Sequence, residues 1–158
     1  MSAVTPFLWF DDSAEEAVTF YTALIPDSAV VSIDRYPDEV PGMGGKVMHV
    51  HFRLGGRDYY GMDAGPQFPF TEAFSLYVPC RDQAEVDRYW DALTADGGQE
   101  QPCGWLKDRY GVSWQVIPPG VREWLTSPDA EARSRVARAV YATHGKLDAV
   151  ALEKAYRG

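Results

Sequence analysis

Two histidines are the residues of this chain best suited to chemistry near neutral pH. His49 and His51 are separated by one residue, so on a β-strand their side chains project from the same face. Such a pair can bind a divalent metal, with Asp63 or Glu72 completing the site, or it can supply a general base. The same spacing also fits a polar strand face that is merely half solvated. These alternatives stay open at the level of sequence.

Aromatic side chains form a second set of candidates, because aromatics make up 13% of the chain. Such side chains either line a cavity for an organic molecule or belong to the core. The candidates are Trp9, Tyr60, Tyr77, Trp105 and Trp114. Cys103 lies near two cations in the sequence, but no Cys-His arrangement accompanies it, which favours a packing role.

The elements that must position these residues occur twice. Residues 5–63 run from a short apolar strand through a capped helix to further strands, and residues 73–117 repeat this order. In the first copy, Ser13 and Glu16 form a capping-box pattern; in the second, a helix is predicted from Asp82 to Ala95. A duplicated module usually has its functional site at the junction of the two copies, so we expect a cavity there.

A glycine pair defines the best-marked hairpin. Gly55-Gly56 separates strands predicted over 46–54 and 57–62. On the longer strand, alternation assigns one face to Met48, Val50, Phe52 and Leu54, and the other to Val47, His49, His51 and Arg53. The remaining predictions are strands at 4–10, 29–36, 74–78, 103–107 and 112–117, a mobile loop at 37–45, and tail helices starting near Asp129 and Asp148.

Composition narrows the class of protein. A net charge of −8 disfavours binding to nucleic acid and to anionic membranes. No apolar run reaches the ~20 residues of a membrane span, and no signal segment is visible, so we expect a cytoplasmic protein. Two cysteines, Cys80 and Cys103, are too few for a disulfide framework. We therefore expect one α+β domain: residues 1–120 hold the paired modules (about 4–63 and 73–118), and 121–158 form a helical extension of the same domain.

Several motifs carry a family resemblance across most of the chain. They are Thr5-Pro-Phe-Leu-Trp-Phe-Asp-Asp12, Glu16-Ala-Val, Phe20-Tyr21, Gly65-Pro66 with Phe68, Phe70, Thr71 and Glu72, Glu85-Val-Asp-Arg-Tyr-Trp90, Cys103-Gly-Trp-Leu-Lys-Asp108, Tyr110-Gly-Val-Ser-Trp-Gln115 and the segment from Lys146 to Tyr156. With these motifs the chain resembles the vicinal oxygen chelate (glyoxalase/bleomycin-resistance) superfamily. The resemblance is closest to the PhnB-like branch, the 3-demethylubiquinone-9 3-methyltransferase domain family.

The resemblance implies two tandem βαβββ modules that form a curved mixed sheet around a cavity, and a homodimer. It also implies four metal-ligand positions, on the first and last strand of each module. In this chain they fall near Thr5, at Met62 or Asp63, at Phe74 or Ser75, and at Gln115. These side chains are poor ligands for a divalent transition metal, which indicates that the usual metal quartet is lost. No glycine-rich loop for a nucleotide-like methyl donor is visible, so methyl transfer is not expected.

Two functions follow as hypotheses. The first is a protein that binds a small aromatic or hydrophobic molecule without a cofactor, with ligand contacts from Gln115, Trp9, Ser75, Tyr77, Asp63 and Trp105. The alternative is a lyase, isomerase or dioxygenase that uses a divalent metal held by His49, His51 and a carboxylate. Whether the chain is an enzyme therefore stays open.

Overall fold

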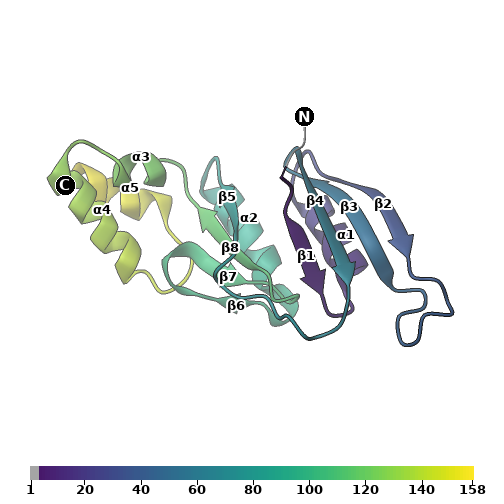
Figure 1. The fold of residues 1–158 in the computed structure, drawn as a ribbon. Coiled ribbons are helices and arrows are strands. Elements are labelled where there is room, and N and C mark those ends of the chain that lie inside the picture. Colours follow the sequence, from purple (N-terminus) through teal and green to yellow (C-terminus); the bar gives the residue numbers. More distant parts are fainter. Residues whose placement is uncertain (1–3) are drawn as a thin grey trace. The chain divides into compact units, whose positions relative to one another are not determined.

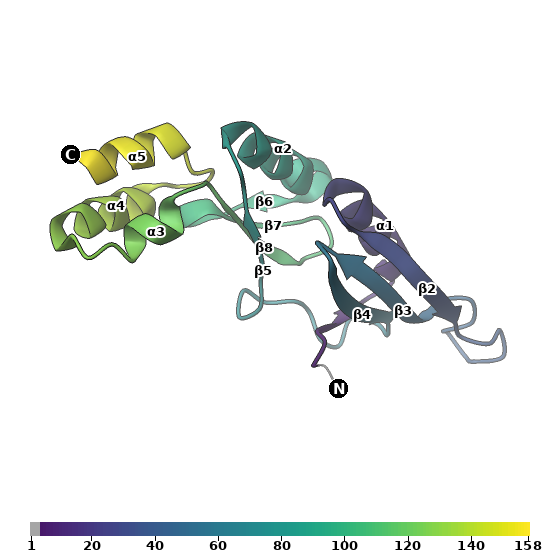
Figure 2. The same cartoon turned by 90° about the horizontal axis from the view of Figure 1, so that it is seen from above.

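One topology occurs twice in the structure, a computed structural model that describes residues 4–158 (Figures 1 and 2). The chain divides into two compact units at Phe70 and Thr71, each with its own four-stranded sheet. The strand orders are β1-β4-β3-β2 and β5-β8-β7-β6, which is the same order in both units. The first pair in each order is parallel and the others are antiparallel. The predicted α+β duplication is confirmed, while the cavity between the copies stays a prediction.

In the first unit, one helix packs on one face of the sheet. The elements are β1 (Phe7–Phe10), α1 (Ala14–Leu24), β2 (Ala29–Arg35), β3 (Val47–Leu54) and β4 (Arg57–Asp63). The core between helix and sheet consists of apolar side chains that are almost fully buried: Ala17, Val18, Tyr21, Leu8, Phe10, Val50 and Phe52. The opposite face of the sheet, here called the first open face, is not covered by α1.

The second unit is built in the same way, with a longer helix. Its elements are β5 (Leu76–Pro79), α2 (Gln83–Thr94), the 3₁₀ turn η1 (Ala95–Gly97), β6 (Gln99–Glu100), the 3₁₀ turn η2 (Pro102–Gly104), β7 (Trp105–Lys107) and β8 (Ser113–Ile117). The core between α2 and the sheet comprises Val86, Tyr89, Trp90, Leu93, Leu76, Leu106, Trp114 and Val116. We call the face of this sheet opposite α2 the second open face.

The two helices begin with different caps. As predicted, Asp82 precedes α2 and its side chain accepts a hydrogen bond of 2.8 Å from the backbone N–H of Glu85. The Ser13 half of the predicted capping box is wrong, because the Ser13 side chain makes no capping hydrogen bond. Asp63, at the end of β4, caps α1 instead: its Oδ1 accepts from Ala14 N–H at 2.8 Å. The cap comes from a residue 49 positions away, which local patterns cannot reveal.

The predicted faces of β3 need one correction at the start of the strand. Met48 is 42% exposed and Val47 is buried, the reverse of strict alternation. On β2, Asp34 lies opposite His49, but the next residue, Arg35, lies opposite Val47. The pairing therefore skips Met48, which lies in a β-bulge. Beyond the bulge the prediction holds.

The first strand of the second copy is shorter than predicted. β5 begins at Leu76, whereas Phe74 lies outside the strand and is 45% exposed. The strand predicted over 103–107 is replaced in its first half by η2, where Cys103 has a positive φ of 63°. Such a backbone cannot continue a strand.

Three helices follow the second sheet: α3 (Val121–Leu125), α4 (Ala130–Ala142) and α5 (Ala149–Arg157). Asp129 and Asp148 cap α4 and α5 as predicted. The helices share a core of their own with the end of β8: Ile117, Val121, Val136, Val140, Leu147 and Leu152. Among residues 4–158, no helix is both long and apolar enough to cross a membrane.

Candidate functional site

Three candidate residues form one row across the second open face. Gln115 on β8 lies opposite Tyr77 on one side and opposite Trp105 on the other. Its sequence neighbours Trp114 and Val116 are fully buried toward α2, so alternation turns Gln115 to the open face. An amide flanked by two aromatic side chains offers a polar contact between two apolar surfaces.

The amide of Gln115 is held by a fourth candidate. Its Nε2 donates a hydrogen bond of 2.9 Å to Ser75 Oγ. Within residues 4–158, no donor to the Oε1 atom of Gln115 is found. The structure therefore brings four of the predicted ligand contacts together, and it leaves an amide oxygen that can accept from a hydroxyl or amino group.

The segment before β5 is attached to the same face. The Glu72 carboxylate lies 2.8 Å from Lys107 Nζ on β7 and accepts from Gln101 Nε2 at 3.0 Å. These contacts, with the hydrogen bond from Lys107 as the largest cause, lower the pKa of Glu72 to about 2. Glu72 thus fixes the segment 71–75, which carries Ser75, across the end of the second open face.

On the first open face, both histidines flank one tyrosine. The ring centroids of His49 and His51 lie 4.9 Å and 4.8 Å from that of Tyr60, so the two imidazoles project from the same face, as predicted. His51 Nε2 lies 3.0 Å from Asp58 Oδ1, and Phe7 lies 5.9 Å from the ring of His49. The contact with Asp58 orients the ring of His51.

Asp63 has a structural role rather than a place in this group. It is only 5% exposed, and its two oxygens accept backbone hydrogen bonds from Ala14 at 2.8 Å and Val47 at 3.2 Å. Its carboxylate therefore faces the α1 side, away from the two histidines. We do not retain Asp63 as a ligand contact or as the carboxylate of a metal site.

The pairing registers of the two sheets show which residue of the first unit occupies the position that Gln115 has in the second. In the first unit Trp9 lies opposite Met62, as Tyr77 lies opposite Gln115 in the second. Met62, not Asp63, therefore shares the open-face position on the last strand. A thioether and an amide are poor partners for a divalent transition metal. Among residues 4–158, no group of three or more His, Cys, Asp or Glu side chains is placed to hold a metal.

Trp9 belongs to the first unit, whereas the four residues of the second open face belong to the second. Its Nε1 donates to the backbone oxygen of Gly65 at 2.8 Å, and its ring packs edge-on against Phe68 at 5.0 Å between centroids. Phe68 is 66% exposed. Trp9 therefore anchors the segment that follows β4, and a role in ligand binding stays a prediction.

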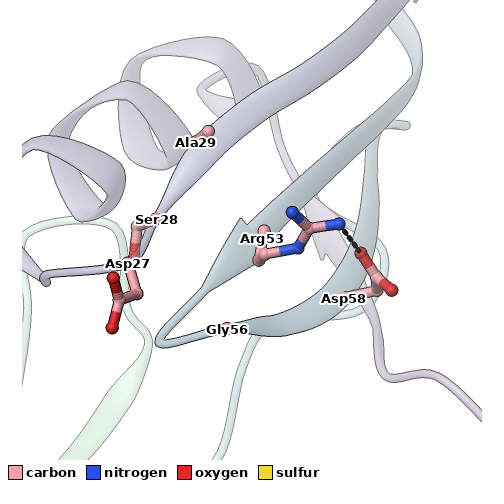
Figure 3. A pocket seen from close by; sticks show the side chains of 6 residues that line it. All are labelled: Asp27, Ser28, Ala29, Arg53, Gly56 and Asp58. Carbon is pink, nitrogen blue, oxygen red and sulfur yellow. Dashed lines mark ion pairs between the residues drawn. The ribbon is translucent and has the colours of Figure 1, made fainter.

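A hollow at the hairpin end of the first sheet was not predicted (Figure 3). It has a volume of about 510 Å³, and its lining includes Asp27, Ser28, Arg53 and Asp58. Arg53 and Asp58 face each other across β3 and β4 with their charged atoms 3.6 Å apart. The two-residue turn at Gly55-Gly56 fixes this register, so the sequence did contain the signal for the pair.

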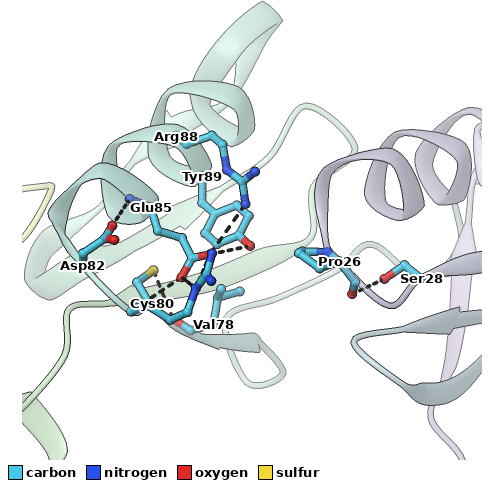
Figure 4. Close-up of polar contacts among 9 residues, drawn as sticks. Pro26, Ser28, Val78, Cys80, Asp82, Glu85, Arg88 and Tyr89 are labelled. Atoms are coloured by element: carbon cyan, nitrogen blue, oxygen red, sulfur yellow. Dashed lines mark hydrogen bonds and ion pairs between the residues drawn. The ribbon is translucent and has the colours of Figure 1, made fainter.

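The buried cysteine of the second unit, Cys80, lies near the carboxylates of Asp82 and Glu85 (Figure 4). Burial, followed by the nearby Glu85 carboxylate, raises the pKa of Cys80 to about 12. Glu85 accepts from the backbone N–H of Arg81 at 2.8 Å and from the hydroxyl of Tyr89 at 3.3 Å. A thiol with so high a pKa is a poor nucleophile at neutral pH, which agrees with a structural role for Cys80.

Comparisons with known proteins identify relatives of this architecture. The model of the 3-demethylubiquinone-9 3-methyltransferase family matches residues 2–117. A solved PhnB protein from Bacillus cereus, described by the same methyltransferase name, is 40% identical, with coverage of 74% of this chain and 99% of that chain and a TM-score of 0.68. No curated protein matches.

Two further solved structures share the fold at lower identity. A protein from Pseudomonas aeruginosa is 22% identical over 75% of this chain and 98% of its own, with a TM-score of 0.61. The fosfomycin resistance protein FosX from Mesorhizobium loti is 13% identical over 80% of this chain and 99% of its own, with a TM-score of 0.55. The family match ends at the end of β8, so helices α3 to α5 lie outside it.

Proposed function

Because the chain belongs to the 3-demethylubiquinone-9 3-methyltransferase family, a PhnB-like branch of the vicinal oxygen chelate superfamily, we propose that it binds a small aromatic or hydrophobic molecule without the superfamily's usual metal quartet. One observation carries this proposal: the amide of Gln115 lies between Tyr77 and Trp105 on the second open face. The ligand is a neutral or weakly polar ring compound that uses this amide as its polar anchor.

Each residue of the row has a physical part in binding. Tyr77 and Trp105 supply apolar ring surface at a low cost in side-chain entropy, and aromatic contacts favour a planar ligand. Gln115 orients the ligand and selects for a polar group, because its amide oxygen can accept a hydrogen bond that an apolar ligand of the same shape cannot donate. Ser75 orients the amide through its hydroxyl.

Equilibrium dialysis with naphthalene and 2-naphthol tests this function. We expect saturable binding with a preference of about fivefold for 2-naphthol, the ratio that one neutral hydrogen bond of about 1 kcal/mol gives. Gln115→Leu should abolish the preference and retain binding of naphthalene. Gln99→Leu, a change of the same kind at an exposed residue of β6, should leave both affinities unchanged. Absence of saturable binding, or an unchanged preference in Gln115→Leu, contradicts the proposal.

A metal-dependent lyase, isomerase or dioxygenase is the second candidate, favoured by the shared face of His49 and His51. The carboxylate nearest to the pair is Asp58, which lies 3.0 Å from His51. The four metal-ligand positions implied by the superfamily do not supply a fitting donor set here, since Met62 and Gln115 occupy the last-strand positions.

Metal analysis separates the two candidates. Protein purified without chelator is analysed for zinc, nickel, manganese and iron, beside the double variant His49→Ala/His51→Ala. The binding function predicts no stoichiometric metal in either protein. One equivalent of metal in the wild type that disappears in the double variant establishes the second candidate instead.

Methyl transfer, the activity in the family description, is not proposed for this chain. The links between β1 and α1 and between β5 and α2 contain no glycine, so the glycine-rich phosphate-binding turn of nucleotide-like donors has no counterpart there. We extend the proposal to a cytoplasmic homodimer. The net charge of −8 per chain disfavours nucleic acid as a partner. Light scattering at micromolar concentration should give the mass of two chains.

A further inference from the structure

One hydroxyl on the second open face is buried without a partner. Ser113 is 1% exposed, and its Oγ has no hydrogen-bond partner among the described residues. Buried polar groups in folded proteins are nearly always paired, because burying an unpaired group has a free-energy cost. The unpaired hydroxyl of Ser113 therefore requires an explanation.

The position of Ser113 relates it to the proposed binding site. It lies two residues before Gln115 on β8, so both side chains project from the second open face. Their Cα atoms are separated by roughly 7 Å at the rise of a strand. Ser113 also lies directly opposite Lys107 on β7, the residue that holds Glu72.

The segment 71–75 is attached to two residues that lie next to Ser113 on the second open face. Glu72 is attached to Lys107, and Ser75 is attached to Gln115, so the chain between them runs along the open face beside the pair of Ser113 and Lys107. The Glu72 side chain is 50% exposed, and exposed ion pairs contribute little to stability. Access to Ser113 needs only the Glu72 end of this segment to move, so the hydrogen bond between Ser75 and Gln115 is kept.

We propose that Ser113 is a second polar contact for the ligand, which rests on the proposed function of Gln115. The ligand then carries two hydrogen-bonding groups at well-separated positions of one ring system, one for the Gln115 amide and one for the Ser113 hydroxyl. This restricts the ligand class to extended aromatic compounds with polar groups on opposite sides. Compounds with a single polar group, or with two adjacent ones, satisfy only Gln115.

Three probes test this spacing: 2-naphthol, 2,6-dihydroxynaphthalene and 2,3-dihydroxynaphthalene. We expect the wild type to bind the 2,6-isomer about fivefold more tightly than 2-naphthol, the ratio of one further hydrogen bond. The 2,3-isomer should show no such gain. In Ser113→Ala the gain of the 2,6-isomer should disappear, while the affinity for 2-naphthol stays the same. A gain that persists in Ser113→Ala overturns the inference.

The thermal midpoint of the ligand-free protein gives an independent readout. Ser113→Ala removes an unpaired buried group, so its midpoint should equal or exceed that of the wild type. Ser134→Ala, at an exposed position of α4, is the control for the same chemical change. A midpoint in Ser113→Ala below that of the control shows that the hydroxyl stabilises the fold and overturns the inference. If 2-naphthol itself fails to bind, the proposed function fails, and the thermal result still decides the status of Ser113.

Discussion

Asp58 and Asp63 lie on the same strand but face opposite sides of the first sheet, and their environments differ accordingly. Asp58 is exposed, forms an ion pair with Arg53 and lies within hydrogen-bond distance of His51 Nε2. Asp63 is buried, and its carboxylate accepts the backbone N–H groups of two other elements. One carboxylate is thus available for charge interactions on the open face, whereas the other holds the start of α1 and the start of β3.

The first prediction follows from this contrast. Asp63→Asn keeps the shape of the side chain but replaces one acceptor by a donor that faces a backbone N–H, so we expect a loss of about 1–3 kcal/mol in the free energy of unfolding. Asp58→Asn should cost at most about 1 kcal/mol, because exposed ion pairs contribute little. Urea unfolding of both variants measures the difference. Equal losses would show that Asp63 does not stabilise these two elements.

For individual residues, the sequence predicted which residues lie together better than it predicted the sheet face on which each side chain lies. Ser75, Tyr77, Trp105 and Gln115 were selected and lie together, although their role in binding stays a prediction. Met62 and Asp63 could not be separated, because a shift of one residue along a strand turns a side chain to the other face. Only the pairing of Trp9 with Met62 resolves this choice.

Among the elements, the segment 71–75 is attached to the second sheet at Glu72 and at Ser75. The hydrogen bond from Lys107 lowers the pKa of Glu72 to about 2, from an ordinary value of 4.5. A carboxylate with a lowered pKa stabilises the folded protein above pH 4.5, and this contribution is lost as the pH falls toward 2. The attachment of the segment is therefore sensitive to acid and to salt.

The second prediction uses this pH window. The difference in thermal midpoint between wild type and Glu72→Gln should be present at pH 6 and should shrink steadily between pH 4.5 and the lowest pH at which both proteins stay folded. High salt should reduce it at pH 6, because half of the Glu72 side chain is exposed. Scanning calorimetry at several pH values provides the measurement. A difference that does not change with pH would refute the role of the Glu72 charge.

The start of β7 is fixed by the tail. Cys103 N–H donates to Thr143 O at 2.9 Å, and Gly104 N–H donates to Gly145 O at 3.0 Å. Gly104 has a φ of +80°, and a Cβ there would lie 2.8 Å from Leu147 Cδ1. The tail therefore holds the turn directly before Trp105, an aromatic residue of the proposed site.

A third prediction tests this attachment. Gly104→Ala should lower the thermal midpoint and change the tryptophan fluorescence, because the new methyl group strains the turn and meets Leu147. Gly42→Ala also has a positive φ, but its Cβ meets nothing within 4 Å, so it reports the backbone strain alone. The change in fluorescence should be absent from Gly42→Ala. An identical effect of both variants would show that the contact with Leu147 does not matter.

The elements themselves were predicted well where their signals are local. The glycine hairpin, the Asp82 cap and the caps of α4 and α5 depend on neighbouring residues, and all are confirmed. The Ser13 cap and the face of Met48 were wrong, because a distant carboxylate and a bulge against β2 decide them. Tertiary contacts of this kind leave no trace in a short stretch of sequence.

At the scale of the whole molecule, the chain is two copies of a family module plus a helical extension. The family match ends at residue 117, and residues 121–158 contain more Lys and Arg than Asp and Glu, unlike the chain as a whole. The duplication was visible in the sequence because each copy repeats its own helix and strand pattern. The burial of the unpaired Ser113 hydroxyl was not visible, because it depends on tertiary contacts over the open face.

NMR spectroscopy tests most directly whether the ligand binds beside Gln115. The side-chain amide signal of Gln115 is assigned by its loss in Gln115→Leu, and the indole signal of Trp105 by its loss in Trp105→Phe. On titration with 2-naphthol, both signals should shift together and saturate at one ligand per chain. If these two signals stay fixed while signals of the first unit, such as the Trp9 indole, shift instead, the proposed site is contradicted.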